Sequence, residues 1–99
     1  MSDIPCYPSG TKEFIRSGVV GGDYTALTPV FMAIMPYDVE PGDDDWYAAQ
    51  WETGTGRAMV FYGGDEGVSE LDEGRYVVWV KPVAPPEEPL LRSGLIRIT

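Results

Sequence analysis

Apolar and polar positions alternate in short runs along this chain, and nowhere do they repeat with the period of a helix. Nine prolines and twelve glycines interrupt the chain, so the apolar segments between them are short. Seven segments have the period of two, or the brief apolar run, that is typical of β-strands. We therefore predict strands over residues 12–20, 30–36, 45–53, 57–63, 67–71, 75–82 and 93–99.

Turn residues separate these segments, as in the stretch TGTG at 53–56. Many short strands at such regular spacing predict an antiparallel β-sandwich. The segments 30–36 and 75–82 are almost continuously apolar, which favours central positions in the sheets. We expect residues 11–99 to form a single domain and residues 1–10 to form an extended arm, either disordered or laid across a neighbour.

The stretch LDEGRYVVWV, at 71–80, introduces the most apolar predicted strand with an acid, a glycine and a tyrosine at alternating positions. The pattern Asp72, Gly74, Tyr76 is that of the tyrosine corner of immunoglobulin-like sandwiches, in which the phenol bonds back to backbone just upstream. We therefore predict an immunoglobulin-like antiparallel β-sandwich of about seven strands. Val78 occupies the place of the usual cysteine, and the single cysteine excludes an internal disulfide, so packing alone must join the sheets.

The predicted core includes Trp51, Val78 and Val80, with Trp46 as the alternative to Trp51. The chain has no histidine, which excludes imidazole catalysis and a Ser-His-Asp triad and makes an ordinary zinc site improbable. The acidic runs at 41–46 and 63–67 are flanked by glycine and have no apolar pocket to raise a carboxyl pKa. We expect neither an enzyme nor a cofactor or metal site. The alternative to the absence of a metal site is calcium binding by the aspartates of 38–45.

The net charge of −9 is unevenly placed, because residues 38–73 carry −10 and the remainder carries +1. Such a charge repels nucleic acid and anionic lipid, and no apolar run is long enough to span a bilayer. We expect no direct nucleic-acid or membrane partner. This asymmetry has three possible roles. Acidic loops of one copy could bind a basic surface on a neighbouring molecule, or the acidic surface could simply keep the protein soluble. The acidic loops could also mimic nucleic acid and so inhibit a host protein.

The proline-rich stretch KPVAPPEEPLL, at 81–91, predicts a stiff loop that projects from one end of the sandwich. A stiff loop loses little entropy on docking, although it would serve equally as a rigid linker. The candidate contact residues are exposed aromatics and members of this region: Tyr7, Tyr37, Tyr62, Pro85, Pro86, Glu87, Pro89 and Arg92.

About half of the chain resembles small proteins from the virion structural gene region of actinobacterial tailed phages and their prophages. Their pattern is a W-x-x-A-x-W-E strand, then L-x-x-G-x-Y-x-V-W-V-K, then a proline-rich segment that ends in L-x-I-T. The matching positions are Trp46, Ala49, Trp51, Glu52, Leu71, Gly74, Tyr76, Val78, Trp79, Val80, Lys81, Pro86, Glu87, Pro89, Arg92, Leu95, Ile98 and Thr99. A doubled proline and an extra glutamate depart from the pattern.

The resemblance implies a non-enzymatic virion protein, made in the host cytoplasm. The leading expectation is a minor capsid protein that decorates and stabilises the head shell, and the alternative is a component of the head-to-tail neck. Its partners would be the major capsid or neck proteins, and particle symmetry would impose a homo-oligomeric arrangement. A carbohydrate-binding or cell-surface-binding module, with Trp46 or Trp79 exposed for stacking on sugars, is the hypothesis from a different class.

Overall fold

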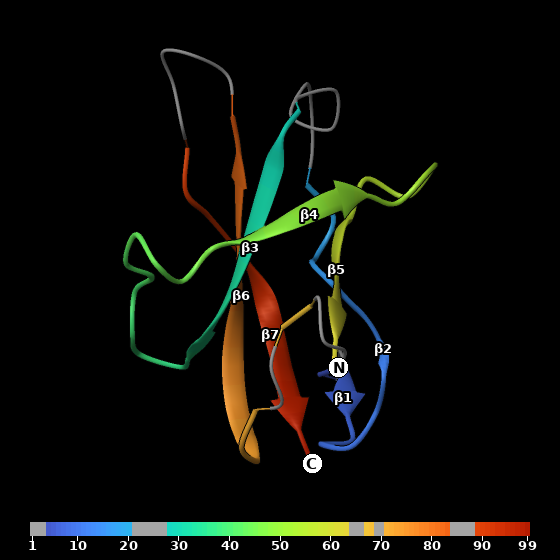
Figure 1. Cartoon of the computed structure of the whole chain (residues 1–99), viewed down its shortest axis with the longest axis vertical. Coiled ribbons are helices and arrows are strands. Elements are labelled where there is room, and N and C mark those ends of the chain that lie inside the picture. The colour runs from blue at the N-terminus through green and yellow to red at the C-terminus, as the bar shows by residue number, and fades with distance from the viewer. Residues whose placement is uncertain (1–3, 21–27, 64–66, 69–70, 84–88) are drawn as a thin grey trace.

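The computed structural model describes residues 4–20, 28–63, 67–68, 71–83 and 89–99. Within these residues the chain forms strands and no helix (Figure 1). The strands are β1 (Cys6–Tyr7), β2 (Glu13–Arg16), β3 (Val30–Pro36), β4 (Tyr47–Trp51), β5 (Ala58–Tyr62), β6 (Gly74–Pro82) and β7 (Leu91–Ile98). The predicted all-β class is confirmed.

The seven strands form one mixed sheet, in the order β1-β7-β6-β3-β4-β5-β2, that is nearly closed as a barrel. Neighbouring strands are antiparallel except β1, which pairs in parallel with β7. Strand β4 belongs to both halves of the sheet. Its residues Tyr47–Ala49 pair with β3, and Gln50 and Trp51 pair with β5. This change of partner bends the sheet around its core.

Backbone hydrogen bonds bring the two ends of the sheet together. The N–H of Gly18, just after β2, donates to the carbonyl of Ser93 in β7 at 2.7 Å. Beside it, in the pairing of β1 with β7, the N–H of Arg97 donates to the carbonyl of Pro5 at 2.9 Å. The described part of the predicted N-terminal arm therefore lies along its own chain, where Cys6 pairs with Arg97.

The core lies between the two halves of the sheet and is built by alternation along the strands. On β3, Met32 and Ile34 point inward, and on β6 Val78 and Val80 do so with 1% and 0% of their surface exposed. Trp51 is only partly buried and packs against this cluster from its edge. The buried cluster comprises Tyr7, Ile15, Val20, Val30, Met32, Ile34, Ala58, Val60, Tyr62, Val68, Val78, Val80, Ile96 and Ile98.

Two details of the predicted strands differ from the structure. The segment predicted as a strand at 67–71 contributes one parallel bridge, between Val68 and Tyr62, and residues 69 and 70 lie outside the described residues. The first predicted strand ends early, because Ser17 and Val20 bond to Ala58 and Gly56 outside the regular ladder. The central positions predicted for 30–36 and 75–82 are those of β3 and β6, which are hydrogen-bonded neighbours. The immunoglobulin-like sandwich itself stays a prediction.

Candidate protein-binding face

The corner before β6 has a structural role. The Tyr76 hydroxyl donates to the carbonyl of Asp72 at 2.7 Å, the hydrogen bond that the sequence pattern predicts. Gly74, at the start of β6, has a φ of +151°, a backbone conformation that side chains rarely adopt. Desolvation by the surrounding protein raises the pKa of Tyr76 above its ordinary 10.0. The corner therefore sets where β6 begins and which of its side chains face outward.

Alternation along β6 sends two kinds of side chain to opposite faces of the sheet. Val78 and Val80 enter the core, while Trp79 pairs laterally with Ala33 and Lys81 with Phe31 on the outer face. Ala33 is fully buried although it lies outside the core cluster, so larger side chains cover it on this outer side. The outer face of β3 and β6 thus carries Phe31, Trp79 and Lys81 beside the buried apolar pair Met35 and Val77.

Four cation–π contacts organise this face. The guanidinium carbons of Arg75 and Arg92 lie 5.3 and 5.6 Å from the centre of the Tyr37 ring. The Lys81 ammonium lies 4.7 Å from the centre of a Trp46 ring and 5.4 Å from that of Phe31. Such contacts stabilise by about 0.5–1 kcal/mol each at exposed sites. We call the set Phe31, Tyr37, Trp46, Arg75, Trp79, Lys81 and Arg92 the aromatic–cationic face.

The charge on β6 and β7 is opposite to that of the molecule. All seven basic residues are described, and four of them, Arg75, Lys81, Arg92 and Arg97, lie on these two strands. None of the four forms an ion pair within the described part of the chain, where the only salt bridge joins Arg16 to Glu52. The face therefore carries unneutralised positive charge on a protein of net charge −9.

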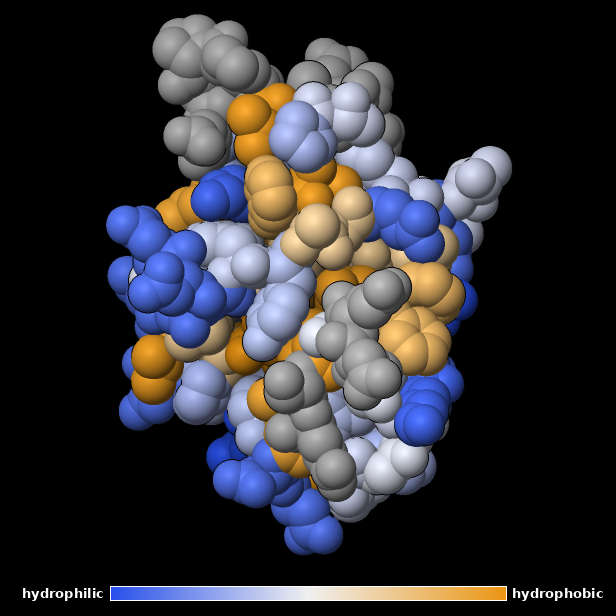
Figure 2. Space-filling model, in the orientation of Figure 1, coloured by the Kyte–Doolittle hydropathy of each residue, from blue (hydrophilic) through white to orange (hydrophobic). Residues whose placement is uncertain are grey.

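The turn between β3 and β4 borders this face. We call residues 38–45 the acidic turn; its acids are Asp38, Glu40, Asp43, Asp44 and Asp45. The Asp45 carboxylate accepts from the N–H of Gly42 at 2.7 Å, which closes the turn locally. Hydrophilic side chains cover this region at the left edge of the molecule (Figure 2). Among the described residues, no three His, Cys, Asp or Glu gather as metal ligands would.

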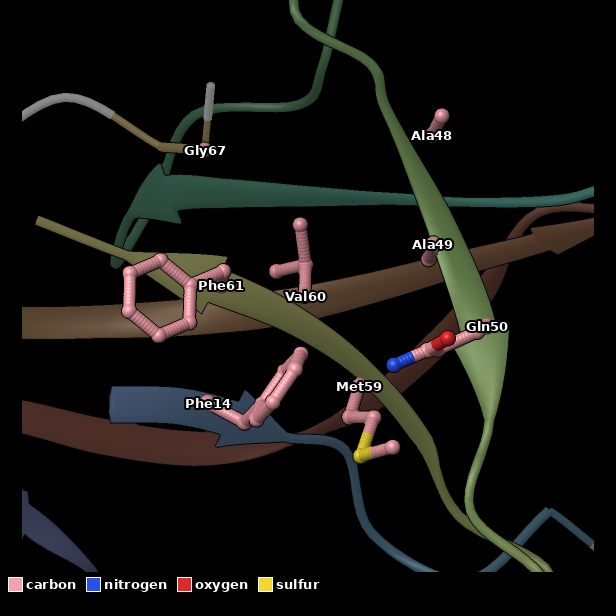
Figure 3. Close-up of a pocket in the computed structure, with 8 residues that line it drawn as sticks. All are labelled: Phe14, Ala48, Ala49, Gln50, Met59, Val60, Phe61 and Gly67. Atoms are coloured by element: carbon pink, nitrogen blue, oxygen red, sulfur yellow. The ribbon is translucent and has the colours of Figure 1, made fainter. Parts of the chain in front are cut away.

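A shallow groove opens on the other half of the sheet, where β4 leaves β5 to pair with β3 (Figure 3). Its volume is about 310 Å³. Phe14 and Phe61 meet edge to face at one end, with ring centres 5.3 Å apart. Gln50 supplies the only polar side chain among the lining residues, which are Phe14, Ala48, Ala49, Gln50, Met59, Val60, Phe61 and Gly67. This lining suits apolar contact, because it brings no nucleophile and no charged group together.

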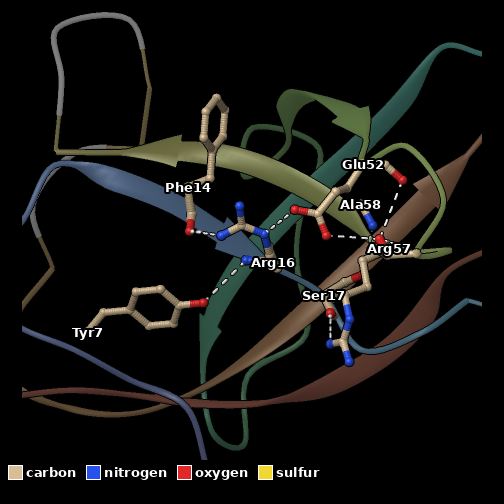
Figure 4. A network of polar contacts seen from close by, with 8 residues as sticks. Tyr7, Phe14, Arg16, Ser17, Glu52, Arg57 and Ala58 are labelled. Carbon is tan, nitrogen blue, oxygen red and sulfur yellow. Dashed lines mark hydrogen bonds and ion pairs between the residues drawn. The ribbon is translucent and has the colours of Figure 1, made fainter.

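A polar network ties β2 to the β4–β5 hairpin (Figure 4). The Arg16 guanidinium bonds to the Glu52 carboxylate, which lowers the pKa of Glu52 and raises that of Arg16. Ser17 is buried, and its hydroxyl accepts from the N–H of Ala58 at 3.0 Å. Arg57 donates to the carbonyl of Ser17 at 3.0 Å. These polar groups are hydrogen-bonded to one another between β2 and the β4–β5 hairpin, so we assign them a role in stabilising the fold.

The predicted contact residues have different positions in the structure. Tyr37 is 49% exposed and Arg92 is exposed, and both belong to the aromatic–cationic face. The expectation that Tyr7 and Tyr62 are exposed is wrong, because they are 8% and 0% exposed and pack in the core. Pro89 is partly buried. The remaining candidates, Pro85, Pro86 and Glu87, lie outside the described residues.

Sequence reasoning missed Arg75 and Lys81 as members of the face. The signal was present in RYVVWVK, at 75–81, where the inward positions Tyr76, Val78 and Val80 leave the alternate positions facing outward. Trp46 and Trp79, the aromatic residues considered for sugar stacking, are both partly buried. Within the described residues, the Trp79 indole nitrogen is buried and has no hydrogen-bond partner.

No protein-family model, curated protein or solved structure matches this chain. Within the part of the chain that the structure describes, no helix is long and apolar enough to cross a membrane.

Proposed function

We propose that this protein is a non-enzymatic structural component of a tailed-phage particle, and that it decorates and reinforces the head shell. The observation that carries the proposal is the aromatic–cationic face. Arginine, tyrosine and tryptophan are the side chains that dominate the binding energy of protein interfaces, and here they stand together where the ends of the β3–β4 turn lie against β6 and β7. The place in a phage particle rests on the sequence resemblance.

The rigidity of the scaffold supports this role. Four members of the face lie on β3 and β6, which pair along seven residues in the middle of the sheet: Phe31, Arg75, Trp79 and Lys81. Strands at this position hold their side chains in one arrangement, so little conformational entropy is lost when the face meets a partner. A decoration protein needs such a rigid surface because identical copies must repeat the same contact around the shell.

The test is to locate the chain in purified particles by cryo-EM and quantitative mass spectrometry. Hundreds of copies spread over the shell are the expected result. If only a few copies were found, in a ring at the neck, the proposed function would change from shell decoration to head-to-tail connection. Absence from mature particles would overturn both forms of the proposal.

A charge-reversal series tests the role of the face in attachment. Particles that lack the protein would be supplied with the wild-type chain, with R75E/R92E, or with K12E as the matched control. Lys12 is exposed and lies outside the aromatic–cationic face. The double variant should bind particles at least about tenfold more weakly, and the control should bind like the wild type. Equal binding by all three chains would contradict attachment through this face.

The relation to immunoglobulin-like sandwiches is also a proposal. It is supported by the hydrogen bond from Tyr76 to Asp72, a feature of those folds. In those folds the strand after the corner lies between two antiparallel neighbours, as β6 lies between β3 and β7. The single, nearly closed sheet departs from their two separate sheets. An experimental structure with two separate sheets would support the relation, and one with a single continuous sheet would refute it.

A further inference from the structure

The aromatic–cationic face and the acidic turn form one continuous surface, because both ends of the turn are anchored on the face. Tyr37 precedes the turn and contacts Arg75 and Arg92. Trp46 follows the turn and contacts Lys81. Positive charge on β6 and β7 therefore lies beside negative charge on the β3–β4 turn, although no ion pair joins the two within the described residues.

This composite surface also exposes apolar side chains. The described residues include four exposed large hydrophobic side chains, and two of them, Tyr37 and Val39, lie at the acidic turn with 49% and 44% of their surface exposed. Apolar groups surrounded by charged ones are the usual composition of a specific protein contact.

We propose that this surface is a self-association site, at which the acidic turn of one copy binds the cationic residues of a second copy, and the reverse, about a two-fold axis. A two-fold interface uses the same patch on both partners, so the patch must be complementary to itself. A surface with positive charge on one side and negative charge on the other meets that condition, because the two-fold rotation places each charge against its opposite.

Charge complementarity also indicates that the molecule bound at this surface is a second copy of the chain. The exposed acids Asp38, Glu40, Asp43 and Asp44 would face the cationic residues of the partner, which are similar in number. Each copy carries a net charge of −9, so two copies repel unless opposite charges meet locally. The composite surface is where the described residues offer that local pairing. The inference rests on the proposed function in treating the aromatic–cationic face as a protein contact, and it makes a neighbouring copy on the shell the partner that this face binds.

The test uses two charge-reversed forms of the full chain, R75E/R92E and E40K/D43K/D44K, in sedimentation equilibrium up to about 1 mM protein, the weakest affinity of interest. In the first form the face and the turn are both net acidic, and in the second both are net basic, so each form should repel its own copies. Each alone should show a dimer dissociation constant raised at least about tenfold over that of the wild type. The positions are exposed, so folding should be retained, and circular dichroism verifies it.

Mixing the two forms is the decisive measurement. Their equimolar mixture should form a heterodimer, because the acidic face of one form meets the basic turn of the other in both halves of the interface. The K12E variant should dimerise like the wild type. A wild-type chain that stays monomeric, or a mixture that stays monomeric, would overturn the inference. Neither result bears on whether the protein is present in particles, which tests the proposed function separately.

Discussion

Tyr62 offers the sharpest test of how the structure distributes stability. Its side chain is fully buried, and its hydroxyl joins two distant segments. It accepts from the N–H of Leu71 at 2.9 Å and donates to the carbonyl of Ser9, which lies 53 positions earlier, at 3.3 Å. The substitution Tyr62→Phe keeps the ring and its packing and removes these two hydrogen bonds.

The expected loss follows from burial. Each intramolecular hydrogen bond contributes about 1 kcal/mol net, and a donor left unsatisfied away from water costs about 1–3 kcal/mol. The Leu71 N–H is partly buried and would lose its hydroxyl partner, so we expect Tyr62→Phe to lower the free energy of unfolding by about 2–3 kcal/mol. For a domain of this size, each kcal/mol shifts the melting temperature by about 4–8 °C, which gives a fall of about 10–20 °C.

Urea unfolding followed by tryptophan fluorescence measures the effect. An unchanged m value would show that the surface area exposed on unfolding is the same in the variant and the wild type. Tyr76→Phe is the matched control, because it removes the same atom from a tyrosine whose partner, the carbonyl of Asp72, belongs to an exposed residue. Water can replace that bond, so the control should lose about 1 kcal/mol or less. If Tyr62→Phe cost no more than Tyr76→Phe, the assignment of a buried structural role to Tyr62 would be wrong.

Three further predictions concern the pH dependence and the backbone. Because Arg16 lowers the pKa of Glu52, the stabilisation from this pair should be full above the ordinary carboxyl pKa and should disappear as pH falls through the lowered one. E52Q should therefore lose stability near pH 7 and converge with the wild type in acid, and E73Q, a change at an exposed acid, is the control variant. The pKa of Tyr76 is raised in the folded state, so its contribution should be lost as pH rises above 10.0, and Y76F should flatten that alkaline decline measured by thermal unfolding. Gly63→Ala should destabilise by at least about 1 kcal/mol, because the φ of +86° disfavours a side chain and the new Cβ would lie 2.3 Å from the carbonyl oxygen of Thr11. Urea unfolding checks this last prediction, with Gly10→Ala as the control because its Cβ would meet nothing within 4 Å.

The sequence by itself determined the class of structure and the local corner. Alternation of apolar positions and punctuation by glycine and proline are properties of neighbouring residues, so they indicate strands without knowledge of how the strands pair. The contact of Tyr76 with Asp72 spans four positions, which makes it predictable from a short pattern. The long apolar runs likewise indicated that 30–36 and 75–82 are central.

Only the tertiary structure decided the order of the strands, the parallel pairing of β1 with β7 and the environment of each tyrosine. Tyr7, Tyr37 and Tyr62 look alike in the sequence, yet two are buried in the core and one lies between arginines from β6 and β7. The physical reason is register. A side chain enters the core or faces outward according to the strand beside it, and that neighbour can come from anywhere along the chain.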